Sequence, residues 1–150
     1  MYNIITAKPS DSIALTELAI QSESYWGYDE VFLKEFAKQY NVTEDYIRDN
    51  PVYMLYTQDS IIGFYGMLLS GEEKSLEYLF VKPEYIGQGY GKILWNHMIK
   101  TCYEEGIKEF VIVTSPQAKE FYTRLGAKYI GEVESIIIKG RKIPKLIYIL

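Results

Sequence analysis

Cysteine and histidine are almost missing from this sequence, which has one of each among 150 residues. Cys102 alone can form no internal disulfide, as suits a reducing compartment. Its neighbours form an apolar helical pattern, so we expect a buried structural thiol and not a nucleophile. His97 has no second histidine and no cysteine beside it, so we expect a structural or solvent-facing side chain and no metal site.

Clusters of basic residues and long apolar runs are missing as well. Lys and Arg total 16 against 20 acidic residues, a net charge of −4, and no basic run provides the electrostatic footprint of a nucleic-acid-binding protein. No apolar stretch approaches the length of a membrane span. Met1–Lys8 lacks the pattern of a secretory signal. We therefore expect a cytoplasmic protein with neither nucleic acid nor a membrane as partner.

The chain is long enough for one domain with a substantial core. It has no repeat, linker or low-complexity stretch, so we expect a single domain over residues 1–150. In its first third, Tyr2–Lys8 is a predicted strand that Pro9 ends. A helix to about Ser24 and a second helix from about Glu30 are predicted next.

After residue 50 the pattern changes to strands. Val52–Gln58 and Ile61–Leu69 predict a β-hairpin, and Leu76–Val81 predicts a third antiparallel strand. The remaining predicted elements are a helix ending near Gly106, a strand over Lys108–Thr114, a helix from Ser115-Pro116, and strands over Lys128–Lys139 and Ile143–Leu150 joined at Gly140-Arg141. The order β-α-α-β-β-β-α-β-α-β-β predicts an α/β fold with a mixed sheet and helices on both faces.

A glycine-rich loop follows the central strand Leu76–Val81. Pro83 ends the strand pairing, because proline has no N–H to donate. Gly87, Gly89 and Gly91 then alternate with other residues, and a helical pattern begins directly behind them. Bare N–H groups and the helix dipole at such a junction attract an anion, so this loop is a candidate phosphate site.

Two common nucleotide loops do not match this spacing. A Walker A loop needs its second glycine five residues after the first and Ser or Thr after the lysine, whereas Gly87 and Gly91 are one residue too close and Ile93 follows Lys92. A Rossmann loop follows the first strand of a βαβ unit, whereas this loop follows a predicted antiparallel meander.

Two segments carry a resemblance to a known family. Val81–Lys92 resembles the cofactor loop of the GCN5-related N-acetyltransferase (GNAT) superfamily, with the pattern Gln/Arg-x-x-Gly-x-Gly/Ala. Ser115–Ala127 resembles the second motif of that family, Asn-x-x-Ala-x-x-Phe-Tyr-x-x-x-Gly-Phe. The chain departs from these patterns in that Ile86 stands at the Gln/Arg position and Ala127 at the last phenylalanine. Tyr25–Asp29 and Gly140–Pro144 resemble a bacterial subgroup of small-molecule type.

The resemblance implies a GNAT-like fold, with a central, mostly antiparallel twisted sheet of about seven strands. It also implies transfer of the acetyl group of acetyl-CoA to a primary amine of a small molecule, by direct attack in a ternary complex. By the same resemblance, backbone of the central strand would hold pantetheine and the glycine loop would hold the pyrophosphate. The residues expected to bind coenzyme A are Leu79, Phe80, Val81, Gly87, Gln88, Gly89, Tyr90, Gly91, Lys92, Gln117 and Tyr122.

Glu77 is the candidate general base. A carboxylate within an apolar strand is costly to bury without a partner. Desolvation would raise its pKa towards neutrality, which suits a base. Alternatively, Glu77 pairs with a cation such as Arg141, or it lies at an exposed start of the strand.

Tyr122 matches the tyrosine that serves as the general acid in the family. A phenol beside the thioester sulfur would protonate the departing thiolate. The alternative is a core aromatic, because Tyr122 also lies on the apolar face of its predicted helix.

The acceptor pocket is expected between the first two helices and the last hairpin. Its candidate residues are Tyr25, Trp26, Tyr28, Asp29 and Arg141. Aromatic rings and a carboxylate attract a cationic amine. The alternatives are a loop that packs on the domain and, for Arg141, a solvated hairpin tip.

Three alternative functions are therefore compatible with the sequence. The first is acetylation of a small amine; the second is acetylation of a protein N-terminus or lysine; the third is a sensor that binds acyl-CoA without transferring the acyl group. The last strands leave a sheet edge that could pair with a second copy, so a homodimer is also an expectation.

Overall fold

A computed structural model describes residues 1–150 and has one seven-stranded sheet. The strand order is β1-β2-β3-β4-β5-β7-β6, and every neighbouring pair is antiparallel except β4 and β5. This confirms the predicted mixed α/β fold. The strands are β1 (Asn3–Thr6), β2 (Val52–Thr57), β3 (Ser60–Leu68), β4 (Ser75–Val81), β5 (Glu109–Val113), β6 (Lys128–Glu134) and β7 (Lys142–Ile149).

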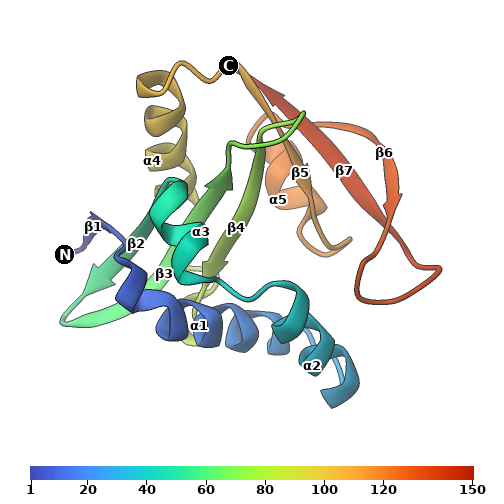
Figure 1. The fold of residues 1–150 in the computed structure, drawn as a ribbon, viewed down its shortest axis with the longest axis horizontal. Helices are drawn as coiled ribbons and strands as arrows, with labels where there is room; N and C mark the ends of the chain where they lie inside the picture. The colour runs from blue at the N-terminus through green and yellow to red at the C-terminus, as the bar shows by residue number, and fades with distance from the viewer.

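The helices lie on both sides of the sheet (Figure 1). They are α1 (Ser12–Ser24), α2 (Glu30–Gln39), α3 (Glu44–Asp49), α4 (Tyr90–Glu104) and α5 (Lys119–Arg124), with short 3-10 turns at Pro9–Asp11 and Pro83–Tyr85. None of them combines the length and the apolar character that a crossing of the bilayer requires.

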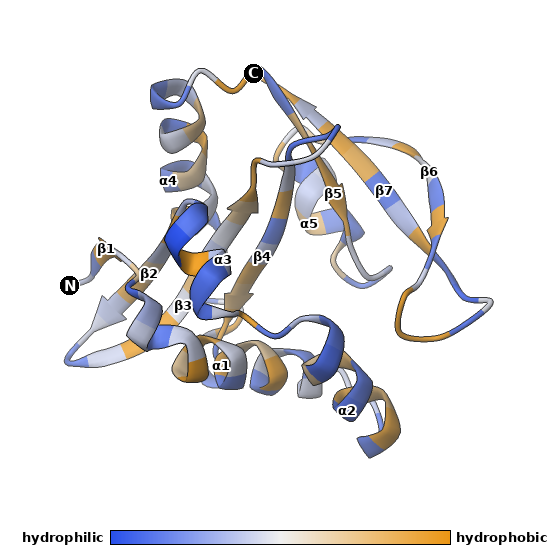
Figure 2. Cartoon of the chain, viewed as in Figure 1, coloured by the Kyte–Doolittle hydropathy of each residue, from blue (hydrophilic) through white to orange (hydrophobic).

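Two separate apolar cores cover the two faces of the sheet. Residues of α1, α2 and α3 pack on one face, and residues of α4 and α5 pack on the other. Strand β3 serves both cores, since Phe64 belongs to the first and Tyr65 to the second. Figure 2 shows hydrophobic and hydrophilic residues mixed along β7, whose successive side chains point to opposite faces of the sheet.

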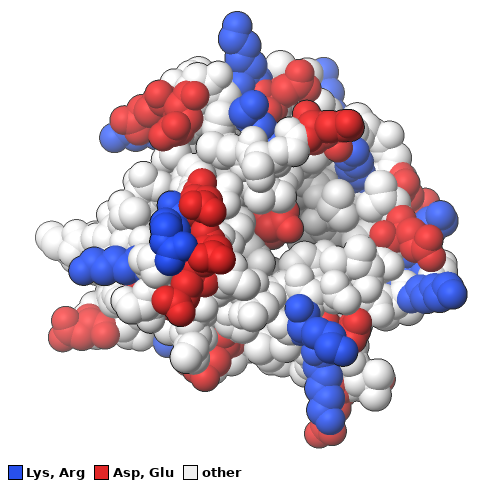
Figure 3. Space-filling view, viewed as in Figure 1, with Lys and Arg blue, Asp and Glu red and all other residues white.

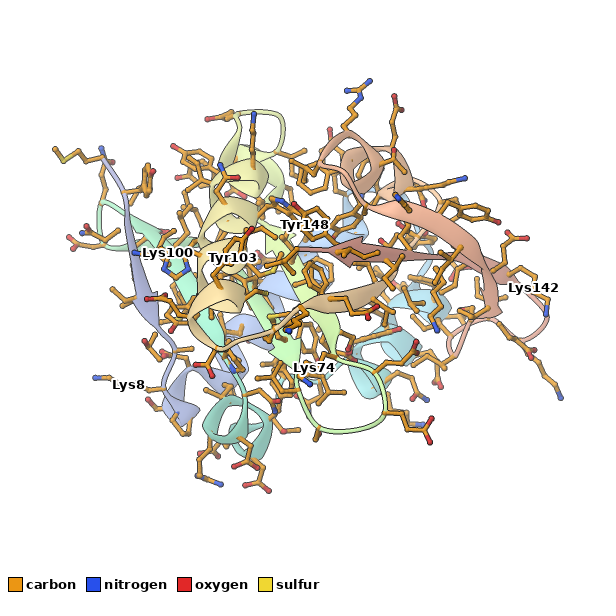
Figure 4. All side chains as sticks on the ribbon, turned by 90° about the horizontal axis from the view of Figure 1, so that it is seen from above. Lys8, Lys74, Lys100, Tyr103, Lys142 and Tyr148 are labelled. Carbon is orange, nitrogen blue, oxygen red and sulfur yellow. The ribbon has the colours of Figure 1, made fainter.

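Helix α4 provides the centre of the second core. Cys102 is fully buried there, with its sulfur 3.6 Å from the sulfur of Met67. The ring of His97 lies at the edge of this core, with Nδ1 2.9 Å from the hydroxyl of Tyr65. Figure 4 shows the molecule from above with Tyr148 of β7 beside α4, where its ring packs edge-on against Trp95 at a centroid distance of 5.1 Å.

The helix predicted from Ser115-Pro116 begins later than expected. Residues 115–118 form a turn in which the N–H of Ala118 donates to the carbonyl of Ser115 at 3.1 Å. Helix α5 begins only at Lys119, with Ala118 as its N-cap. The prediction was wrong because proline after serine is equally compatible with a turn.

The strand predicted over Lys128–Lys139 was also too long, because β6 ends at Glu134. The hydroxyl of Ser135 accepts hydrogen bonds from the N–H groups of Ile137 and Ile138, at 3.1 and 3.2 Å. These bonds satisfy backbone donors locally and bend the chain into a loop between β6 and β7. Strand β6 lies at the edge of the sheet, and the homodimer stays a prediction.

Strands β4 and β5 are joined at one end only. Ser75 and Val111 are their single register pair, next to a hydrogen bond of 2.9 Å from the N–H of Val111 to the carbonyl of Lys74. Beyond this point the two strands diverge, as Figure 1 shows. The edge of β4 that faces β5 is therefore open along most of its length.

Candidate active site

A cavity of about 540 Å³ occupies the opening between β4 and β5. Residues of β4, the glycine loop, α5, the first two helices and the β6–β7 loop line it. The residues proposed from the sequence that line it are Trp26, Tyr28, Glu77, Leu79, Phe80, Val81, Gly87, Gly89, Tyr90, Gly91, Lys92, Gln117, Tyr122 and Arg141. Figure 3 shows acidic atoms near the middle of this face in a region of mostly uncharged atoms, with further charged groups around that region.

The glycine loop takes a backbone shape that requires glycine. Gly87 and Gly89 have φ angles of +83° and +89°, a region that other residues rarely adopt. Gly91 is needed for a different reason, because a Cβ there would lie 3.2 Å from the ring of Phe121. The loop thus leads the chain into α4 and lets α4 pack closely on α5.

The start of α4 fits an anionic group. Gly89 is its N-cap, and no side chain accepts a hydrogen bond from the first turn. The N–H groups at this end therefore remain available, and the helix dipole favours negative charge. Lys92 lines the cavity beside them and forms no ion pair. Gln88 instead donates from Nε2 to the carbonyl of Glu84 at 3.1 Å and does not line the cavity.

The open edge of β4 fits an extended polar chain. The N–H of Lys82 donates to the carbonyl of Ile62 in β3 at 2.8 Å. In an antiparallel pair, bonding to one neighbour occurs at every second residue. Leu79 and Val81 therefore direct their N–H and C=O groups towards β5, where no strand accepts them. The pantetheine contacts expected at these residues have the free backbone groups they need.

Glu77 lies at a β-bulge. Tyr78 is opposite Gly66 and Leu76 is opposite Met67, so Glu77 between them has no partner on β3. A bulge re-aims a side chain and is common beside active sites. Here the side chain of Glu77 lines the cavity.

The carboxylate of Glu77 forms no ion pair. It accepts a hydrogen bond from the hydroxyl of Ser75 at 3.2 Å. Arg141, the cation considered as an alternative partner, forms no salt bridge with it. Its negative charge contributes to a raised pKa of Tyr40, after the larger effect of burial. Glu77 therefore lies in the cavity lining together with Tyr40, whose pKa its charge affects.

Tyr122 is nearly buried but lines the cavity. Its ring centroid lies 5.9 Å from that of Trp95 and 5.1 Å from that of Phe121. Its hydroxyl has no hydrogen-bond partner in the protein and is not sealed from the cavity. Burial, and then the charge of Glu23, raise the pKa of this phenol. Tyr122 thus keeps its proton at neutral pH, as a general acid must.

Tyr28 connects three segments across the cavity mouth. Nε2 of Gln117 donates to the hydroxyl of Tyr28 at 2.9 Å, and a guanidinium nitrogen of Arg141 donates to the same oxygen at 3.4 Å. The ring of Tyr28 stacks on Phe32 with centroids 3.8 Å apart. The α1–α2 turn, the segment before α5 and the β6–β7 loop therefore meet at one oxygen.

Tyr25 and Asp29 do not line the cavity. The carboxylate of Asp29 accepts a hydrogen bond from the N–H of Phe32 at 2.8 Å and caps α2. This bond satisfies a backbone group that would otherwise lack a partner. Tyr25 is half-exposed and packs edge-on against Trp26, which itself lines the cavity.

Sequence reasoning missed Glu23, a cavity residue at the end of α1. Burial raises the pKa of its carboxyl to about 7, against a smaller lowering by the charge of Arg141. A signal was present in the sequence, since Glu23 lies four and eight residues after the fully buried Ala19 and Leu15. That spacing places an acid on the buried stripe of a helix.

A family model described as an acetyltransferase (GNAT) domain matches residues 13–135. The chain belongs to the GNAT acetyltransferase family. This confirms the family predicted from the two motifs, whose members transfer the acetyl group of acetyl-CoA.

Solved structures of this family share the fold. The PaiA N-acetyltransferase of Thermoplasma acidophilum, in complex with coenzyme A, is 21% identical with a TM-score of 0.82, and the alignment covers 100% of this chain and 99% of that one. The ribosomal-protein-S18-alanine N-acetyltransferase of Escherichia coli is 17% identical with a TM-score of 0.71, over 98% and 91% of the two chains. At these identities the likeness concerns the fold.

One relative is closer in sequence. The peptidyl-lysine N-acetyltransferase YjaB of Salmonella typhimurium is 34% identical over 94 residues. The matched segment covers 62% of this chain and 61% of that relative.

Proposed function

We propose that this GNAT protein transfers an acetyl group from acetyl-CoA to the primary amine of a small molecule. The observation that supports a small acceptor is the bridge at Tyr28. A peptide needs an open groove between the first helices and the last hairpin, and Arg141 of the β6–β7 loop is bonded to Tyr28 across that passage. An amine that enters the cavity whole needs no such groove.

Different residues of the cavity would bind different parts of the cofactor. The N–H groups at the start of α4, with Lys92, would hold the pyrophosphate of coenzyme A. The free backbone groups of Leu79 and Val81 would bond to the pantetheine arm. The bound cofactor supplies an acetyl thioester, and holding an amine in line with it is worth roughly 7–11 kcal/mol of the barrier.

Two side chains that line the cavity would transfer the protons. Tyr122 gives a proton to the departing thiolate, because its phenol stays protonated at neutral pH. Glu77 is the predicted base for the nitrogen as the amide forms. Its position at the bulge, without a competing cation, supports this role.

A second acceptor class is favoured by one observation. The relative from Salmonella typhimurium is named a peptidyl-lysine N-acetyltransferase, so a lysine side chain on a protein is the alternative acceptor. A lysine side chain is itself a primary amine on a flexible chain, and it could reach the cavity if the Tyr28 bridge opens.

A thiol-release assay combined with calorimetry tests these alternatives. Acetyl-CoA is titrated calorimetrically into the protein, and free thiol is then measured with small amines, lysine peptides and peptides with a free N-terminus. Faster release with small amines supports the proposal, and faster release with peptides replaces it by protein acetylation. Binding without release on any amine indicates a sensor, and absence of binding overturns the proposal.

A further inference from the structure

Glu23 is a carboxylate in the cavity without a protein partner. It lines the cavity next to the buried Ser22, and its side chain forms no hydrogen bond or salt bridge. None of the buried polar side-chain atoms of the protein lacks a partner, so the oxygens of Glu23 still reach open space. A half-buried carboxylate in this position is costly unless a ligand supplies a cation or donor.

Charged and titratable groups from four other segments surround Glu23. Arg141 of the β6–β7 loop lowers its pKa, and the charge of Glu23 in turn raises the pKa of Tyr122 in α5 and of Tyr40 beyond α2. Tyr40 also feels the charge of Glu77 in β4. When Glu23 and Glu77 are both ionised, the single positive charge of Arg141 neutralises only one of their two negative charges. A ligand that carries one positive charge would neutralise the other.

Apolar side chains line the same cavity as Glu23. The cavity lining includes aromatic and aliphatic side chains from the α1–α2 turn, from α2 and the residue after it, and from the β6–β7 loop, namely Trp26, Phe32, Phe36, Tyr40 and Ile137. Aromatic faces attract a cation, and apolar walls bind an apolar body. The chemistry that fits is an ammonium group on an alkyl or arylalkyl chain.

We propose that Glu23 binds the ammonium of the acceptor and takes the proton that must leave before attack, an inference that rests on the proposed acetyl transfer. The carboxylate takes one proton from the ammonium and leaves a neutral amine with a free electron pair. The nitrogen then forms a bond to the acetyl carbon as the carbon–sulfur bond breaks, and the thiolate receives a proton from Tyr122. Glu77 takes the second proton from the nitrogen as the amide forms, and an equivalent proton returns from solvent to Tyr122, so the net release is the one proton that passes from Glu23 to solvent.

Three matched variants test the role by kinetics. Glu23→Gln keeps the size of the side chain and removes its charge and its capacity as a base. Glu77→Gln does the same at the other cavity acid. Glu17→Gln changes an exposed acid of the same helix and serves as the control. Each is assayed with butylamine, benzylamine, phenethylamine and a lysine peptide, at saturating acetyl-CoA.

We expect Glu23→Gln to lower kcat/KM for the preferred amine by about 10²-fold, with an unchanged KM for acetyl-CoA. In wild type, kcat/KM for the amine should rise with pH around a pKa of about 7. In Glu23→Gln this pH-dependent rise should be absent. Glu17→Gln should match wild type. If Glu23→Gln keeps both the rate and the pH-dependent rise while acetyl transfer persists, the inference is overturned and the proposed function stands.

A measurement without turnover separates this inference from the failure of the proposed function. The carboxyl carbons of glutamate are labelled with ¹³C, and the Glu23 signal is identified by its loss in Glu23→Gln. We expect its titration midpoint near 7 to fall when butylamine, benzylamine or phenethylamine is added, and to stay unchanged with the matching alcohols. A midpoint that none of the amines moves overturns the inference, even where acetyl transfer is observed.

Discussion

The hydroxyl of Tyr28 lies 2.9 Å from Nε2 of Gln117, although 89 positions separate the two residues. The same oxygen lies 3.4 Å from a guanidinium nitrogen of Arg141. One phenol therefore joins the helical segment that precedes β2 to both later segments that border the cavity. Size selection of the acceptor would depend on this contact.

Removal of the Tyr28 hydroxyl should weaken the selection of acceptors by size. In Tyr28→Phe the ring still stacks on Phe32, but Gln117 and Arg141 lose their common acceptor. We expect the ratio of kcat/KM for a lysine peptide to that for the preferred small amine to rise several-fold, with a stability loss of about 1 kcal/mol. Tyr25→Phe is the control, because the hydroxyl of Tyr25 forms no hydrogen bond. An unchanged ratio would show that the bridge does not restrict the acceptor.

Tyr122→Phe separates chemistry from binding. The hydroxyl has no protein partner, so its removal should leave thermal stability close to wild type. Loss of the general acid should reduce kcat by about 10²-fold or more, with acetyl-CoA affinity unchanged in calorimetry. Undiminished turnover would return Tyr122 to the role of a core aromatic.

Gly89→Ala tests the loop against a control with equal backbone strain. Gly89 and Gly106 have φ angles of +89° and +71°, and a Cβ at either position would meet no atom within 4 Å. Both alanine variants should lose roughly 1–2 kcal/mol of stability, because the left-handed conformation disfavours a side chain. Only Gly89→Ala should also weaken acetyl-CoA binding. Equal affinities in the two variants would contradict the assignment of the anion site to this loop.

The raised pKa of Glu23 predicts a pH-dependent stability. Between its usual pKa of 4.5 and the value of about 7 in the fold, the native state holds more of this proton than the unfolded state does. The stabilisation is therefore complete below pH 4.5 and is lost as the pH rises through about 7. Urea unfolding should show Glu23→Gln more stable than wild type at pH 8 and equal to it at pH 4. Glu17→Gln should follow wild type at both pH values, and a parallel curve for Glu23→Gln would contradict the prediction.

Local patterns in the sequence predicted what depends on local structure. The strand periods, the glycine loop and the apolar stripe of α4 follow from neighbouring residues, so the fold and the turn into α4 could be anticipated. The capping role of Asp29 was also accessible, since it directly precedes a predicted helix start. The turn at Ser135 also depends on a local interaction, in which the serine hydroxyl bonds to nearby backbone N–H groups. It was not predicted, because the long apolar run around it favours a strand.

Other features arise only when distant segments pack. The bulge that leaves Glu77 unpaired depends on the register of β4 against β3. The pKa of Glu23 depends on its burial in the cavity, which raises it, and on the charge of Arg141, 118 positions away in the chain, which lowers it by less. The Tyr28 bridge depends on three loops that no helical or strand period relates. Sequence spacing therefore predicted the backbone shape of the glycine loop better than it predicted which residues line the cavity near the first two helices.

The sheet is continuous across β4 and β5 through one residue pair, Ser75 and Val111. A ligand that bonds to the free backbone of β4 within this opening extends the sheet. It therefore stabilises the folded state in addition to serving as a substrate. Its contribution to stability grows as RT ln(1 + [L]/Kd), about 2.7 kcal/mol at a hundred times Kd. The amides of Leu79 and Val81 should then exchange with solvent more slowly as acetyl-CoA accumulates, and the protein should resist proteolysis best when its donor is abundant.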